Sequence, residues 1–209
     1  MVEFIKQRID IVRTTPIVAE MKNPKGVLIH FVPNDLEYFK QFDLSDKDIQ
    51  TKIKMSLRHF TTTESTYNVI DEGLLIATGD YAYKLCFKNG VIEFFRNNLE
   101  TQNILNPNLH HIKIDNVFLI ANSFLKGALE LHGKHFKTPE PFHLYITLVN
   151  VQGCLIYSLT DRLLTFDPIP KPIVAFQPIE NNNYSDPLGK KIRETIISDI
   201  KNSFSWEYI

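Results

Sequence analysis

Apolar residues recur along the chain at two spacings, and together these spacings predict a mixed fold. Segments 3–13, 115–132 and 186–201 carry apolar side chains at helical spacing. Strand-like apolar runs fall between them, at 27–32, 67–95, 142–151, 154–158 and 173–179. Because the strands follow one another through turns rather than helices, we expect an α+β fold with a mainly antiparallel sheet and flanking helices.

The pair Asn89-Gly90 predicts a hairpin and fixes a register for its two strands. A two-residue turn places one set of side chains on a shared core face, namely Tyr81, Tyr83, Leu85, Phe87, Ile92 and Phe94. On the opposite face Glu93 is then diagonal to Lys84 and Lys88. We expect an exposed charge cluster there, on a face that is at least partly wet.

Capping residues suggest where the helices begin and end. Asp115 and Asp186 suit helix N-caps, and Gly133 suits the position just after a helix. Segment 34–65 is polar and irregular, apart from a capping box at Ser45 that predicts a helix to about Met55. We expect a mobile insertion at 34–65, and a single domain over 1–209 because neither repeats nor linker-like stretches occur.

Composition narrows the classes of function. Of the 209 residues 44% are hydrophobic and 22% charged, with a net charge of −1, so there is no overall basic excess for binding nucleic acid. Cys86 and Cys154 are too few for a disulfide framework and suggest buried thiols in a reducing compartment. Without a long apolar run or a signal-peptide pattern, we expect a cytoplasmic protein that does not insert into a membrane.

The sequence carries none of the common catalytic or phosphate-binding motifs. The dinucleotide fingerprint, the P-loop, Gly-x-Ser-x-Gly and His-Glu-x-x-His are all absent. Two Ser-x-x-Lys matches, 123–126 and 198–201, lie on polar helix faces, where a lysine is not desolvated. We predict no catalytic residue and no cofactor, with one open alternative: an enzyme site assembled from His30, Tyr67 and Asp199.

Histidine spacing offers a weak metal hypothesis. His132 and His135 are three residues apart, and His143 follows. A zinc site needs three or four converging ligands, whereas the expected helix end at Gly133 separates the first two. We therefore favour a structural His132 and predict no metal, with these three as the weak candidates.

Basic residues interleave with aromatic ones between 81 and 96, as on platforms that stack single-stranded nucleic acid. The candidate contacts are Lys84, Lys88 and Arg96. Because the predicted register turns most aromatics and the lysines to opposite faces, core packing is the favoured interpretation. A nucleic-acid-binding module stays as the alternative.

Four segments carry a family resemblance. The first comprises 4–9, Thr15-Pro16 and the strand 27–33, which ends in Pro33; the others are 67–75, Phe-Lys-Asn-Gly-Val-Ile-Glu at 87–93, and the strand 148–153, which ends in Gly153. In this order they are similar to the C-terminal region of bacterial proteins with an AlbA-type DNA-binding domain, also described as Schlafen-like or as ATP-binding transcriptional regulators. In such proteins the AlbA-type domain precedes this region and is credited with binding DNA or nucleotide. None of the 209 residues corresponds to that domain, so the resemblance assigns its activity to no residue here.

These observations together predict a non-enzymatic accessory domain of a bacterial regulatory or defence-type protein. Its expected role is to sense a ligand or to contact a protein partner, including a second copy of itself. The sequence names neither the ligand nor the partner.

Overall fold

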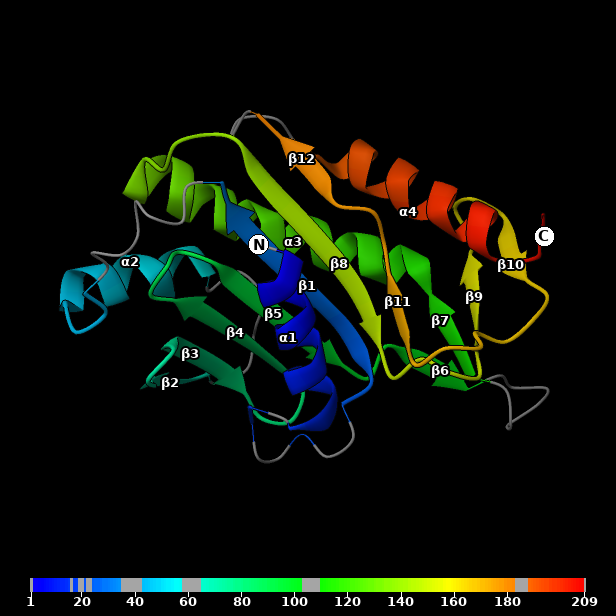
Figure 1. Cartoon of the computed structure of the whole chain (residues 1–209), viewed down its shortest axis with the longest axis horizontal. Helices are drawn as coiled ribbons and strands as arrows, with labels where there is room; N and C mark the ends of the chain where they lie inside the picture. Colours follow the sequence, from blue (N-terminus) through cyan, green and yellow to red (C-terminus); the bar gives the residue numbers. More distant parts are fainter. Residues whose placement is uncertain are drawn as a thin grey trace.

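The structure, a computed structural model, describes residues 2–15, 17–18, 21, 24–34, 43–57, 65–102, 110–182 and 188–208. In this part of the chain two β-sheets combine with four α-helices (Figure 1). The fold is α+β with a mainly antiparallel sheet, as predicted.

Sheet A is the larger sheet, and its strands pair antiparallel throughout. Its strands are β1 (Gly26–Pro33), β2 (Thr66–Val69), β3 (Gly73–Thr78), β4 (Ala82–Phe87), β5 (Ile92–Asn97), β8 (Phe142–Val149), β11 (Ile173–Ala175) and β12 (Ile179–Asn181). The order is β11-β8-β1-β5-β4-β3-β2, with β12 also paired to β8. Strand β1 is therefore central, and β2 is an edge.

Sheet B is smaller and was not predicted as a separate sheet. Its strands are β6 (Glu100–Gln102), β7 (His110–Lys113), β9 (Cys154–Ser158), β10 (Leu163–Thr165) and β13 (Trp206–Tyr208). The order is β13-β10-β9-β7-β6, and β7 pairs with β9 in parallel. Three of these strands have only three residues, which is too short to show an apolar period.

Helices cover both faces of sheet A, which explains why β1 is buried along its whole length. The helices are α1 (Val2–Thr14), α2 (Lys47–Leu57), α3 (Ile114–Leu129) and α4 (Gly189–Ser203). Figure 1 shows α1 in front of the sheet and α3 behind it. One hydrophobic cluster joins α1 to the sheet through Ile5, Ile9 and Val12, and a larger one holds α2, α3, α4 and parts of sheet B on the other face.

The β4–β5 hairpin has a register one residue away from the prediction. Its loop has three residues, because Phe87 N–H donates to Val91 O and Gly90 takes a positive φ of 80°. The one-residue shift turns Ile92 and Phe94 toward α3, and it turns Glu93 toward α1. The predicted shared face, the wet opposite face and the exposed Glu93 were therefore wrong, since both faces of the hairpin are buried.

Two helix boundaries and one strand also differ from prediction. Lys113, not Asp115, is the N-cap of α3, and Gly133 lies inside a π-helical continuation, Glu130–Phe136, that ends at Lys137 with a φ of 50°. The run 173–179 divides into β11 and β12 around Pro178, which lacks the N–H that a continuous strand would need.

Some expectations fall outside the described residues. The predicted start of the last helix at Asp186-Pro187 lies there, and so does much of the expected insertion at 34–65. The helix predicted within that insertion is present as α2. In the described part of the chain, no helix has both the length and the apolar character needed to span a bilayer.

Candidate functional site

A buried carboxylate lies at the centre of the α1 face of sheet A. Glu93, on β5, has no exposed surface and accepts two hydrogen bonds from Arg8 on α1, each of 2.9 Å. The Tyr83 hydroxyl donates to Oε1 at 2.8 Å, and His30 Nε2 lies 2.9 Å from Oε2. Side chains from α1, β1 and β4 thus converge on one carboxylate of β5.

The ionisation of this network follows from its contacts. Burial acts to raise the pKa of Glu93, but the hydrogen bonds and charges of Arg8 and His30 outweigh it and lower the pKa to about 2. Burial and the adjacent carboxylate raise the pKa of Tyr83 well above its ordinary value. An ionised Glu93 only accepts, so His30 supplies Nε2–H. Because Glu93, His30 and Tyr83 are buried in the sheet and Arg8 reaches them from α1, the arrangement suits fastening α1 to the sheet.

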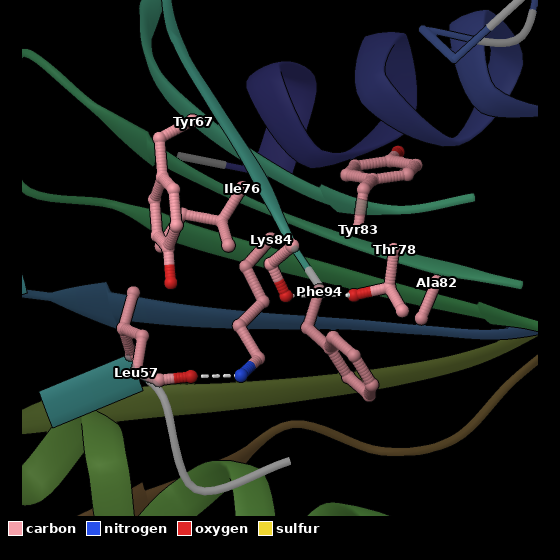
Figure 2. A pocket seen from close by; sticks show the side chains of 9 residues that line it. Leu57, Tyr67, Ile76, Thr78, Ala82, Tyr83, Lys84 and Phe94 are labelled. Carbon is pink, nitrogen blue, oxygen red and sulfur yellow. Dashed lines mark hydrogen bonds between the residues drawn. The ribbon is translucent and has the colours of Figure 1, made fainter. Parts of the chain in front are cut away.

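Lys84 lies on the opposite face of the hairpin, where Figure 2 shows it extending from β4 to the end of α2. Its Nζ donates to the backbone oxygen of Leu57, the last residue of α2. The side chain is buried, and burial lowers its pKa to about 7. The cavity beside it, flanked by Tyr67 and Phe94, is only about 10 Å³. That is room for about one water molecule, so Lys84 holds the C-terminal end of a helix rather than a substrate.

The three residues proposed for contact with nucleic acid do not form one exposed surface. Lys84 faces the interior, Lys88 is exposed in the hairpin loop, and Arg96 is half-buried. The Arg96 guanidinium stacks 4.5 Å from the ring centre of Tyr81. Of the three, only Lys88 is exposed.

The candidate metal ligands are also dispersed. His132 is fully buried, its Nδ1 lies 2.9 Å from Thr138 Oγ1, and its ring stacks on Phe31. Burial lowers the pKa of His132 to about 3, so the ring is neutral. His143 alternates with the α3-facing Phe142 on β8 and so lies across the sheet. His135 is half-exposed on the π-helical segment, and the described residues include no group of three or more ligands arranged for a metal.

A polar cluster that the sequence did not suggest centres on Glu100. Its Oε2 lies 2.7 Å from Lys25 Nζ and 3.2 Å from His110 Nδ1, and it accepts a hydrogen bond from Cys154 Sγ at 3.7 Å. Glu100 is thus the shared partner of both His110 and Cys154. Burial is the main cause that raises the pKa of Cys154, so the thiol is protonated and is a poor nucleophile.

A wide groove runs between α3 and the N-terminal part of α4. Two hollows of about 430 and 460 Å³ adjoin each other, because Leu119, Asn122 and Gly189 line both. We call this surface the α3–α4 groove; it is lined by Asp115, Phe118, Leu119, Asn122, Ser123, Leu125, Lys126, Leu129, Thr160, Leu188, Gly189, Lys190 and Arg193. Its volume lies in the range of ligand-binding clefts in proteins.

Leu119 is the exposed apolar centre of this groove. Its side chain is 68% exposed, whereas the neighbouring Phe118 is buried. Gly189 lets α4 approach α3 closely, since a Cβ there would lie 3.0 Å from Asn122 Oδ1. Leu119 is therefore an exposed apolar side chain that lines both hollows.

Ion pairs and hydrogen bonds fix one end of the groove. Arg193 donates from Nε and Nη2 to Asp161 Oδ1 at 3.1 and 3.0 Å. Asp115 accepts from the backbone N–H of Leu159 at 3.0 Å and from Ser158 Oγ at 3.2 Å. Burial acts to raise the pKa of Asp115, but hydrogen bonds from residues 158–160 outweigh it and lower the pKa. Asp115 therefore holds the turn after β9 instead of capping α3.

The remaining sequence candidates are spread over the molecule. His30 is under α1, Tyr67 is on the edge strand β2, and Asp199 Oδ2 accepts from Gln177 N–H at 2.7 Å. The structure thus places the scattered-site residues apart. Of the Ser-x-x-Lys pairs, Ser123 and Lys126 line the α3–α4 groove.

Comparison of the chain with protein-family models, with curated proteins and with solved structures gives no match. The resemblance to the C-terminal region of AlbA-type or Schlafen-like proteins therefore stays a prediction.

Proposed function

We propose that this protein is a non-enzymatic accessory domain that binds an amphipathic helix of a partner protein in the α3–α4 groove. The observation that carries the proposal is Leu119, an exposed apolar side chain shared by two adjoining hollows. A helix lying in a groove is a common mode of peptide recognition, in which apolar anchors recur at helical spacing.

The dimensions of the groove suit such an occupant. Its lining on α3 runs from Asp115 to Leu129. At 1.5 Å per residue this is about 20 Å, the length of about 14 helical residues. Phe118, Leu125 and Leu129 follow this line at helical spacing. The first two are buried, so the apolar surface open to a partner is Leu119 together with the partly exposed Leu129.

Charge indicates that the partner helix is acidic. Lys126 and Lys190 are exposed at the groove, and Arg193 pairs with Asp161 at one end of it. Among the described residues of the lining, Asp115 is the one acidic residue, and it is already bound to the turn after β9. A carboxylate that flanks the apolar stripe of a partner would therefore meet the exposed Lys126, whereas Lys190 and Arg193 already pair with Glu194 and Asp161.

Two further observations support the accessory role. Four segments of the chain resemble a region of regulatory proteins that follows their DNA-binding domain. Both cysteines are buried free thiols, which suits a protein that acts in the cytoplasm. We therefore propose that the partner belongs to a bacterial regulatory or defence-type system.

Selection from a library of random peptides displayed on phage tests this function. We expect enriched peptides to carry apolar residues at i, i+3 or i+4 and i+7, with acidic residues beside them. Leu119→Asp should abolish their binding, because it places a carboxylate at the apolar centre of the groove. The matched control is Met55→Asp, which changes an apolar side chain of similar exposure on α2.

Three results would contradict the proposal. Peptides that bind Leu119→Asp and the wild-type protein equally would locate binding elsewhere. Salt-dependent binding of DNA or RNA without peptide enrichment would favour the nucleic-acid module. A concentration-dependent dimer that Leu119→Asp disrupts, again without peptide enrichment, would make a second copy the occupant.

A further inference from the structure

A second recess lies at the opposite side of the molecule, between α1 and the turns of sheet A. It has a volume of about 290 Å³. Phe4, Arg8 and Ile11 line it from α1. Glu72 lines it from the turn before β3, Phe87 from the end of β4, and Lys88 from the turn that follows. We call it the α1 recess. It is separate from the α3–α4 groove, because α1 covers the other face of sheet A.

Arg8 brings a fixed positive charge to the wall of this recess. Its side chain is 3% exposed, and its Nε and Nη2 are held by the buried Glu93. The guanidinium also lies 4.9 Å from the ring centre of Phe87. These contacts fix the plane of the group before any ligand arrives, which lowers the entropic cost of binding one.

The donor capacity of Arg8 is only partly used. A guanidinium has five N–H groups, and Arg8 makes three hydrogen bonds. The third runs from Nη1 to Glu72 Oε1 at 3.4 Å, whereas charge-assisted hydrogen bonds are typically about 2.7 to 2.9 Å long. The Glu72 side chain is 49% exposed. The Glu72 carboxylate is thus only weakly bound to the guanidinium of Arg8, whose position is fixed by Glu93.

We propose that the α1 recess binds a small carboxylic acid with an apolar body. Its carboxylate replaces that of Glu72 at Arg8 Nη1, and its apolar part packs against Phe4, Ile11 and Phe87. Lys88 is exposed at the rim and balances the added negative charge once Glu72 has turned out to solvent. The recess is at the small end of the range for ligand sites, which limits the ligand to fragment size.

A titration with 4-phenylbutyrate, followed by two-dimensional NMR, tests this site. The neutral control ligand is 4-phenyl-1-butanol, which has the same apolar body without the charge. We expect the acid to shift the amide signals of residues 4–11 and 88–89 and to saturate, and the alcohol to bind at least several-fold more weakly. Equal binding of both ligands, or saturation by neither, would overturn the proposal.

Substitutions at the rim separate a specific site from general affinity for organic acids. Glu72→Gln removes the competing carboxylate and should tighten the binding of 4-phenylbutyrate by roughly three- to tenfold. Lys88→Met should weaken it by a similar factor. Both side chains are exposed, so the fold is expected to be retained. Lys126→Met, in the α3–α4 groove, is the matched control and should change nothing.

If Glu72→Gln and Lys88→Met bind the acid as the wild type does, the assignment of the carboxylate to Arg8 is wrong. This test is independent of the proposed function, because no peptide enters it and the groove variants serve only as controls.

Discussion

The residue that best shows how this molecule is held together is Glu93. Its carboxylate has no exposed surface, yet it is charged, since Arg8 binds both of its oxygens. Tyr83 and His30 complete the set of donors. If one partner of a buried charge pair is removed, the other charge stays buried without compensation. The resulting loss of stability is larger than the loss when apolar residues replace both partners.

Glu93→Gln is expected to destabilise the protein by about 3 to 5 kcal/mol, because the buried Arg8 keeps only its longer contact with the half-exposed Glu72 as counter-charge. The free energy of unfolding in urea measures this loss. The control is Glu194→Gln, which changes an exposed residue paired with Lys190 at 3.6 Å and should cost less than about 1 kcal/mol. Equal losses for the two variants would contradict a structural role for the buried network.

Glu93 also predicts how stability depends on acid. Its pKa is about 2 in the folded protein, against an ordinary value of 4.5 that applies to the unfolded chain. The unfolded state therefore binds more protons between these values, and stability falls as pH decreases from about 4.5 toward 2. Glu93→Gln lacks this contribution, so the gap in unfolding free energy between the two proteins should narrow over this window. A gap that stays constant would refute the assignment.

The buried Lys84 predicts that the stability of the fold depends on pH in the alkaline range. Its pKa is about 7 in the folded protein, against an ordinary value of 10.5. Between these values the unfolded chain binds the additional proton, so stability rises with pH. Lys84→Met should remove this rise when unfolding is measured from pH 7 to 10. A variant that keeps the wild-type slope would show that another group titrates.

Sequence patterns could identify only some of the residues that form the α3–α4 groove and the α1 recess. Leu119 carries a signal in the sequence, because it is apolar and lies outside the buried stripe of its helix, which includes Val117, Ala121 and Phe124. The role of Arg8 has no such signal, since its partner Glu93 is 85 positions away and reaches it only through the register of the hairpin. A pairing between residues so far apart produces no periodic pattern in the sequence around either residue.

At the scale of elements, the β4–β5 hairpin determines which side chains enter which core. Asn-Gly is compatible with a two-residue loop and also with a three-residue loop that ends in a left-handed glycine. The structure has the second, closed by the hydrogen bond from Gly90 N–H to Phe87 O. Local preference alone does not separate the two loops, whereas burial on both faces favours the register in which Glu93 meets Arg8.

Nuclear Overhauser effects give a direct test of this register. In the structure Lys84 faces Phe94 and Cys86 faces Ile92, and we expect strong contacts between the Hα atoms of these pairs. A two-residue loop would place Leu85 opposite Phe94 instead. Observation of that pairing would remove Glu93 from the α1 face and contradict the account of the buried network.

The sequence predicts well those elements in which apolar residues recur at a regular spacing. The buried face of α4 is Ile192, Ile196 and Ile200, and the N-cap residue Leu188 is buried in line with them, as the spacing indicates. The continuation of α3 as a π-helix past Gly133 was not predictable in the same way. A glycine permits a helix end but does not require one, and here Leu131 and His132 are buried and keep the chain helical.

At the scale of the whole molecule, the layers leave two recesses on opposite sides of sheet A. The α3–α4 groove lies between helices far apart in sequence, and the α1 recess lies under the first helix. The groove has the exposed Lys126 beside its apolar walls, and the recess has Arg8, which Glu93 holds in place. Sequence patterns predicted the α+β class and the helices, but not these recesses, because each joins segments separated by more than 50 positions.

The central claim is that the α3–α4 groove is the binding surface, and backbone amide shifts test this most directly. A peptide from the phage selection is titrated into isotopically labelled protein, and each amide signal is followed by NMR. The account predicts that the shifted amides gather on α3 from Asp115 to Leu129 and on the first turn of α4, and that Leu119→Asp abolishes the shifts. Shifts that gather instead on β2 or on α1, and persist in Leu119→Asp, would contradict it.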